Sequence, residues 1–102
     1  MKILELPLKK EWYNMIEDGD KREEYREIKQ YWENRLALYD NRNVLVGLNP
    51  HGYTHVRFRY GYTKRTMLYK IDEITIGRGN PNWGAPTDKD VFIIKFHEYE
   101  NN

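Results

Sequence analysis

Residues 91–96, Val-Phe-Ile-Ile-Lys-Phe, form an almost continuous apolar run that constrains the fold more than any other segment of the chain. A short apolar run of β-branched and aromatic residues is typical of a strand covered on both faces. We therefore predict a central strand here, with neighbouring strands supplied by the rest of the chain.

A second strand is predicted for residues 54–60, where side chains alternate in character. Alternating residues of a strand point to opposite faces of its sheet, so one face here is apolar and the other strongly basic. The apolar set is Val56, Phe58 and Tyr60, and the basic set is His55, Arg57 and Arg59.

The next apolar residues keep the strand period but change phase. Met67, Tyr69 and Ile71 share one phase, whereas Ile74 and Ile76 are displaced by one residue. Such a slip predicts a bulge or bend near residues 72–73. A loop should follow, since residues 77–86 are rich in glycine, proline and asparagine.

Two helices are predicted, at about residues 9–18 and 27–38. Their apolar residues recur at helical spacing, and Gly19 is a natural end for the first helix. Shorter strands are expected at residues 3–6, ended by Pro7, at 21–27 and at 44–48. The apolar stripes are Trp12, Met15 and Ile16 in the first helix, and Ile28, Tyr31, Trp32 and Leu36 in the second.

These elements predict an α+β fold, a small mixed β-barrel with about two helices packed against it. At 102 residues the chain has room for one domain, residues 1–102. Cysteine is absent, which excludes disulfides, thiolate metal sites and cysteine nucleophiles. No apolar run approaches the roughly 20 residues that cross a bilayer, and the apolar stretch at the N-terminus is too short for a signal peptide. We therefore expect a soluble, cytoplasmic protein without membrane contact.

Charge is distributed unevenly although the net charge is only +1. Residues 41–70 contain six Lys or Arg and no Asp or Glu. Such a segment can attract an anionic ligand, although a charge run is also compatible with an ordinary solvated surface. The sequence leaves these two interpretations open.

The segment Gly19-x-Lys21-x-x-Glu24-x-Arg26 combines a helix end with three charged side chains. On a straight strand Glu24 and Arg26 share a face, and Lys21 joins them only if it lies in the turn after Gly19 or if the strand bulges. Two cations could hold a phosphate or carbonyl oxygen, and a carboxylate between them could order them or accept a proton. From the residues alone, a surface strand with weak ion pairs is the simpler interpretation.

This segment, following a short strand and an amphipathic helix, resembles the signature of the ASCH domain, a branch of the PUA-like superfamily. The entry Leu-Pro-Leu-Lys at residues 6–9 and the apolar strand near the C-terminus agree with that order of elements. The resemblance covers nearly the whole chain. It implies a compact β-barrel and a cleft, floored by the motif, that binds RNA or modified nucleosides.

Some members of this family are enzymes. One branch hydrolyses the amide of an acetylated cytidine with a lysine, a threonine and a glutamate. The lysine corresponds to Lys21, but Glu24 stands at the threonine position, so the hydroxyl nucleophile is missing. Glu73 is a candidate for the glutamate by neighbourhood only. Other members cleave RNA, which needs no protein nucleophile.

Basic and aromatic residues outside the motif form a second candidate surface for single-stranded nucleic acid, because cations track phosphates and rings stack on bases. Trp83 lies on a proline- and glycine-rich loop, where we favour a plug over the barrel end rather than a lid. The ligand-binding candidates are Lys21, Arg26, His55, Arg57, Arg59, Tyr62, Lys64, Arg65 and Trp83.

The three histidines make a weak metal site without cysteine or a His-rich motif, so we predict no metal and no cofactor. His55 is an alternative proton-transfer group for RNA cleavage.

Three functions follow. The first is a reader of RNA, single-stranded nucleic acid or a modified nucleotide. The second is a hydrolase of RNA or of a modified nucleoside, with Lys21 and Arg26 stabilising negative charge and Glu24 as general base. The third is a protein-interaction module. The sequence favours the first, leaves open whether the protein is an enzyme, and does not fix its oligomeric state.

Overall fold

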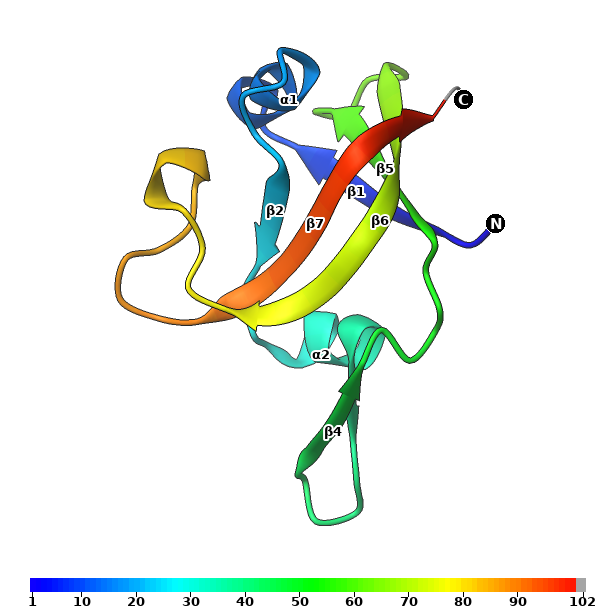
Figure 1. Cartoon of the computed structure of the whole chain (residues 1–102), viewed down its shortest axis with the longest axis vertical. Coiled ribbons are helices and arrows are strands. Elements are labelled where there is room, and N and C mark those ends of the chain that lie inside the picture. Colours follow the sequence, from blue (N-terminus) through cyan, green and yellow to red (C-terminus); the bar gives the residue numbers. More distant parts are fainter. Residues whose placement is uncertain (101–102) are drawn as a thin grey trace.

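The computed structural model describes residues 1–100 and has an α+β architecture built on one five-stranded sheet. The strand order is β1-β5-β6-β7-β2, with β1 and β5 parallel and the other neighbours antiparallel. Figure 1 shows the sheet curling into a half-barrel. The strands are β1 (Ile3–Leu8), β2 (Glu23–Arg26), β5 (His55–Tyr60), β6 (Thr66–Gly77) and β7 (Val91–Glu100).

The central strand predicted from the apolar run is β7, which lies between β6 and β2. Its residues Val91–Ile94 and Phe96 are buried. Phe92, Ile94 and Phe96 enter the main core inside the curl, whereas Val91 and Ile93 join a smaller cluster on the other face. The prediction that both faces are covered is therefore confirmed.

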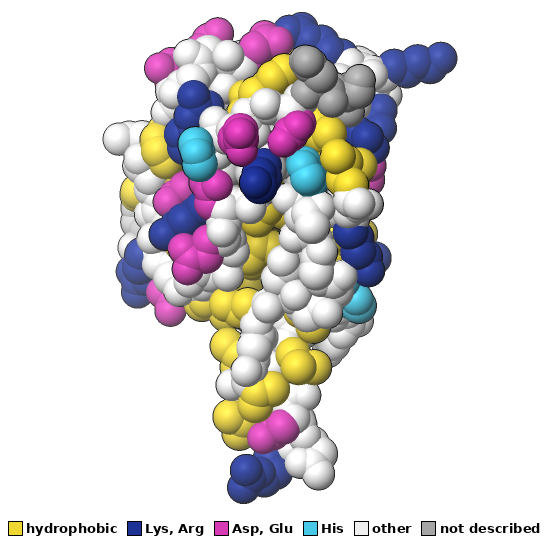
Figure 2. All heavy atoms as spheres, turned by 45° about the vertical axis from the view of Figure 1, so that its right-hand side comes forward, with side chains coloured by type: hydrophobic (Ala, Val, Ile, Leu, Met, Phe, Trp, Pro, Cys, Tyr) yellow, Lys and Arg dark blue, Asp and Glu magenta, His cyan; other side chains and the backbone are white. Residues whose placement is uncertain are grey.

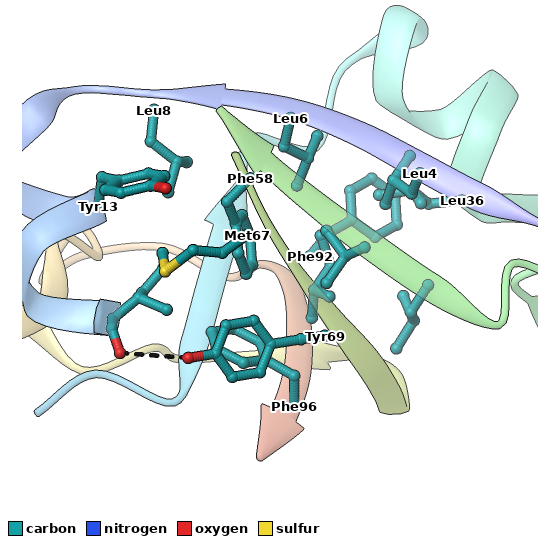
Figure 3. Packing of buried hydrophobic residues seen from close by; sticks show 14 of the residues in the cluster. Leu4, Leu6, Leu8, Tyr13, Leu36, Phe58, Met67, Tyr69, Phe92 and Phe96 are labelled. Atoms are coloured by element: carbon teal, nitrogen blue, oxygen red, sulfur yellow. Dashed lines mark hydrogen bonds between the residues drawn. The ribbon is translucent and has the colours of Figure 1, made fainter. Parts of the chain in front are cut away.

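The main core contains an aromatic cluster among aliphatic side chains (Figure 3). Phe58, Tyr69 and Phe96 meet with ring centroids 4.9–6.0 Å apart. The Tyr69 hydroxyl donates a 3.5 Å hydrogen bond to the Ile16 carbonyl oxygen at the end of the first helix. This bond gives a buried hydroxyl a partner, as burial requires.

The predicted alternation and slip are both confirmed. Val56 and Phe58 are fully buried while their neighbours in β5 are half-buried. Strand β6 runs unbroken over Thr66–Gly77, and its register with β7 shifts between Lys70 and Glu73, where the side chains change phase.

Strand β1 does not end at Pro7, as predicted, but continues to Leu8. The reason is that β1 is an edge strand, paired only with β5. A proline has no N–H for the ladder, and an edge strand can leave that position unpaired on its open side.

Helix α1 (Lys10–Glu17) matches the first predicted helix, and Gly19 follows it with φ of +87°. That left-handed conformation is strained for residues with a side chain, so glycine suits this helix end. Its buried residues are Tyr13 and Ile16. Trp12, which we expected in the core, is half-buried and borders the cleft described below.

Helix α2 (Gln30–Leu36) is shorter than predicted at both ends. Lys29 is extended before it, and the chain leaves it directly into β3 (Ala37–Tyr39), which pairs with β4 (Leu45–Leu48). Because Ala37–Tyr39 pair with β4 in this hairpin, these residues do not extend the helix. Ile28 and Tyr31, predicted to be buried on the apolar stripe of this helix, are exposed.

The β3–β4 hairpin projects from the body of the molecule (Figure 1), and Figure 2 shows hydrophobic side chains gathered on this projection. Among residues 1–100, no helix is long and apolar enough to cross a membrane.

Candidate ligand-binding cleft

Lys21 is completely buried, although lysine is rarely found without solvent contact. Its ammonium donates a 2.6 Å hydrogen bond to the Trp83 carbonyl oxygen and lies 3.1 Å from Oε2 of Glu24. The ammonium also lies 4.6 Å from the centre of the Trp12 ring. Burial lowers the pKa of Lys21, and the Glu24 carboxylate opposes this shift.

The turn after α1 brings Lys21 to this position. The backbone N–H groups of Asp20 and Lys21 both donate to the Met15 carbonyl oxygen, at 2.9 and 3.2 Å. Lys21 is thus fixed before β2 begins at Glu23. Lys21 therefore joins Glu24 and Arg26 from the turn after Gly19, which is one of the two arrangements predicted from the sequence.

Glu24 is nearly buried, and its two oxygens have different surroundings. Oε1 accepts hydrogen bonds from the Tyr25 backbone N–H at 3.2 Å and from Nη1 of Arg26 at 3.3 Å. Oε2 lies beside the Lys21 ammonium, but without hydrogen-bond geometry, and has no hydrogen bond among the described residues. The carboxylate is therefore held between two cations, one on each side.

Arg26 extends from the same strand toward β1. Its Nη1 also donates to the Tyr25 carbonyl oxygen at 2.8 Å, and its Nη2 donates to the Pro7 carbonyl oxygen at 3.2 Å. Its guanidinium carbon lies 5.2 Å from the centre of the Trp32 ring. Burial lowers the pKa of Arg26, but an arginine remains charged at any physiological pH. With 17% of its side chain exposed, Arg26 is the most solvent-exposed of the three charged residues of the motif.

The loop after β6 closes against this motif. Besides the Lys21 bond to Trp83, the backbone N–H of Asn80 donates to the Tyr25 hydroxyl at 2.9 Å. A Cβ at Gly79 would lie 2.6 Å from both Ala85 and the Tyr25 ring, so only glycine allows this approach. The loop forms one wall of the cleft, and it is fixed by contacts that span more than fifty residues of sequence.

Two adjoining hollows lie over the motif. One, of about 300 Å³, lies where β1, α1, β2 and the loop meet, and Glu24, Arg26 and Trp12 border it. The other, of about 340 Å³, continues from it between β2 and the loop. They share Tyr25, Arg26 and Gly84. We call the two hollows together the motif cleft.

Most basic residues predicted to bind ligand on β5 and in the following turn are engaged by acidic groups or carbonyls. Arg57 pairs with Glu5, a residue of β1, and Nη2 of Arg65 lies 2.7 Å from both oxygens of Glu17. Arg59 donates to the Thr63 carbonyl oxygen. Figure 2 shows acidic and basic side chains interspersed on the upper part of the molecule. The segment is basic in sequence, but acids from distant segments offset its charge in the fold.

The remaining predicted residues are separated. His55 lies on β5, and its Nε2 is 3.7 Å from Oε1 of Glu100. It is distant from the motif in sequence, and none of the motif contacts described above involves it. Tyr62 is 96% exposed and Lys64 is exposed. The Trp83 side chain packs on the small cluster around Val91, and only its carbonyl reaches Lys21. Trp83 therefore covers one face of the sheet instead of plugging a barrel end.

Sequence reasoning missed Lys9 and underrated Trp12, which both border the cleft. Lys9 could have been recognised from its position directly after the first strand, which places it at the border of the cleft beside the motif. Trp12 was assigned to the core because its spacing from Met15 and Ile16 is helical. Among residues 1–100, no group of three or more His, Cys, Asp or Glu side chains could hold a metal ion.

Comparisons with family models, with curated proteins and with solved structures found no match to this chain.

Proposed function

We propose that this protein binds RNA or a modified nucleotide by placing one nucleobase in the motif cleft, as an ASCH domain of PUA-like architecture would. The observation that carries the proposal is the nearly buried Glu24–Arg26 pair at the floor of a hollow of about 300 Å³. This volume is at the small end of the range for ligand pockets, which suits a nucleoside better than a large cofactor.

The chemistry of the cleft fits a nucleobase. A carboxylate accepts hydrogen bonds from ring N–H or amino groups, and a guanidinium donates to carbonyl oxygens and ring nitrogens. Trp12 adds a large aromatic surface at the border, and unpaired bases are commonly recognised by such stacking. Lys21 has no exposed surface, so its role in this proposal is to hold Glu24 and the loop in place.

The test is a titration with ribonucleosides, with their acetylated and methylated derivatives, and with short single-stranded RNA. Glu24→Gln removes the acceptor charge and should weaken binding about 10- to 150-fold, because a hydrogen bond to a charged group contributes roughly 1.5–3 kcal/mol. Trp12→Leu should weaken binding without touching the ion pair. The matched control is Glu98→Gln, which removes an exposed carboxylate from the outer face. If no nucleoside or RNA binds, or if Glu24→Gln and the control behave alike, the proposal fails.

Hydrolysis of RNA or of a modified nucleoside is the second candidate, favoured by a carboxylate and a guanidinium that border the same hollow. In that case Glu24 acts as general base, Arg26 stabilises developing negative charge, and Lys21 positions the base. Mass spectrometry of the titrated mixtures tests it: a new product should appear with the native protein and be absent with Glu24→Gln. Turnover by Glu24→Gln would exclude this role.

The third possibility is a protein partner. A nucleoside that binds in the motif cleft would displace a protein partner bound there, but not a partner bound elsewhere. Competition between the partner and a nucleoside therefore distinguishes protein binding from nucleotide binding.

A further inference from the structure

A third hollow of about 280 Å³ lies at the junction of β1 and α1. This hollow and the one over the motif share Pro7, Leu8 and Lys9 as lining residues, so the three hollows adjoin one another in a row, which we call the groove. A row of three adjoining hollows is larger than a single nucleoside requires.

The cations at this junction are free of acidic partners. Among residues 1–100, neither Lys9 nor Lys10 forms an ion pair, and both are exposed. The Lys10 ammonium lies 5.4 Å from the centre of the Tyr60 ring, so its contact is with an aromatic face and not with a carboxylate. Arg65, by contrast, is engaged by Glu17.

The lining of the whole groove carries more basic than acidic residues, although Arg26 and Lys89 pair with Glu24 and Glu27. Four basic side chains border it against two acidic ones. Both acidic residues border the motif cleft, whereas the two charged residues of the third hollow are lysines. The basic residues are Lys9, Lys10, Arg26 and Lys89, and the acidic ones are Glu24 and Glu27.

Tyr62 borders the far end of the groove with 96% of its surface exposed. The turn that carries it is fixed to β1, because the backbone N–H of Gly61 donates a 2.9 Å hydrogen bond to the Leu8 carbonyl oxygen. An exposed aromatic ring carried by a fixed turn at the end of a basic groove offers a face on which a base can stack.

We propose that the groove binds single-stranded RNA across at least two nucleotides. One base enters the motif cleft, the phosphate that follows lies at Lys9 and Lys10, and the next base stacks on Tyr62. This inference rests on the proposed function, and it makes an RNA strand, instead of a free nucleoside, the natural ligand.

The experiment compares the best-binding nucleoside of the panel with the dinucleotide and trinucleotide that contain it. Stacking contributes about 1–3 kcal/mol per base, so the dinucleotide should bind about 5- to 150-fold more tightly. Tyr62→Ser should remove the stacking part of this gain. Tyr99→Ser, at a half-exposed tyrosine outside the three hollows, is the matched control.

Salt dependence tests the phosphate position. Each lost phosphate contact should reduce the log–log slope for the dinucleotide by about 0.7. Lys10→Ala should therefore flatten the slope, whereas Lys70→Ala, at an exposed lysine of the outer face, should not.

The outcomes are distinguishable from those of the proposed function. Equal affinity for the nucleoside and the dinucleotide overturns the groove while preserving the cleft. Unchanged dinucleotide affinity in Tyr62→Ser also overturns it. If neither the nucleosides nor the RNAs bind, both proposals fail together.

Discussion

The buried contact between Lys21 and Glu24 allows a quantitative test of how the motif stabilises the fold. Lys21→Met removes the ammonium from a site without solvent, together with its bond to the Trp83 carbonyl oxygen. Breaking a buried ion pair from one side costs about 3–5 kcal/mol. A domain of this size has a total stability of about 5–15 kcal/mol, so the variant should fold but be weakened. Its melting temperature should fall by more than 10 °C, since about 1 kcal/mol corresponds to 4–8 °C.

A double-mutant cycle isolates the contact itself. Glu24→Gln alone leaves two cations without their shared carboxylate, and Lys21→Met alone leaves the carboxylate with Arg26 only. The double variant removes the ammonium and the carboxylate together, so that only Arg26 is left without its carboxylate partner. Its loss of unfolding free energy should therefore be smaller than the sum of the single losses, by about 0.5–3 kcal/mol.

Urea denaturation followed by tryptophan fluorescence measures all four proteins. The control cycle uses the exposed pair of Lys95 and Glu73, 3.9 Å apart, whose coupling should lie between about 0 and 1 kcal/mol. Additive losses at Lys21 and Glu24, or a coupling no larger than that of the exposed pair, would refute the reasoning.

Three further changes have definite expected outcomes. Gly79→Ala should destabilise the protein by about 1–3 kcal/mol, because its added carbon would lie 2.6 Å from the Tyr25 ring; Gly47→Ala meets no atom within 4 Å and should stay within about 0.5 kcal/mol in thermal melts. Phe96→Ala should cost about 3–5 kcal/mol in urea denaturation, because that ring is buried in the aromatic core; a loss below 1 kcal/mol would contradict the packing. The lowered pKa of Lys21 means that, between this pKa and the usual value of about 10.4, the folded protein binds fewer protons than the unfolded one. The stability of the native protein relative to Lys21→Met should accordingly rise with pH across that interval, and a constant difference would contradict the assignment.

Features set by local sequence were predictable. Alternation fixed the two faces of β5, the phase change located the irregularity in β6, and an apolar run marked the central strand β7. In each of these cases a strand's own side chains show which face is buried. The end of α1 was also predictable, because the conformation at Gly19 is a backbone preference of that residue.

Features that depend on distant partners were not predictable. The basic set on β5 is offset partly by Glu5, which is 52 residues away in sequence and becomes a neighbour only when β1 pairs beside β5. The end of α2 depends on pairing between Ala37 and Leu48. The composition of a local segment does not reveal such pairs, because the two partners lie far apart in the sequence and become neighbours only in the folded sheet.

The motif lies between these two cases. Its spacing placed Glu24 and Arg26 two residues apart on β2, but only the turn after Gly19 decided that Lys21 would join them. The register of β2 is set independently by pairing with β7, where Glu24 lies opposite Ile94. Two separate elements therefore converge on one carboxylate: a helix end that holds the lysine and a paired strand that holds the acid. Because the lysine in turn binds the loop that walls the cleft, the stability of the fold and the shape of the cleft depend on the same contacts.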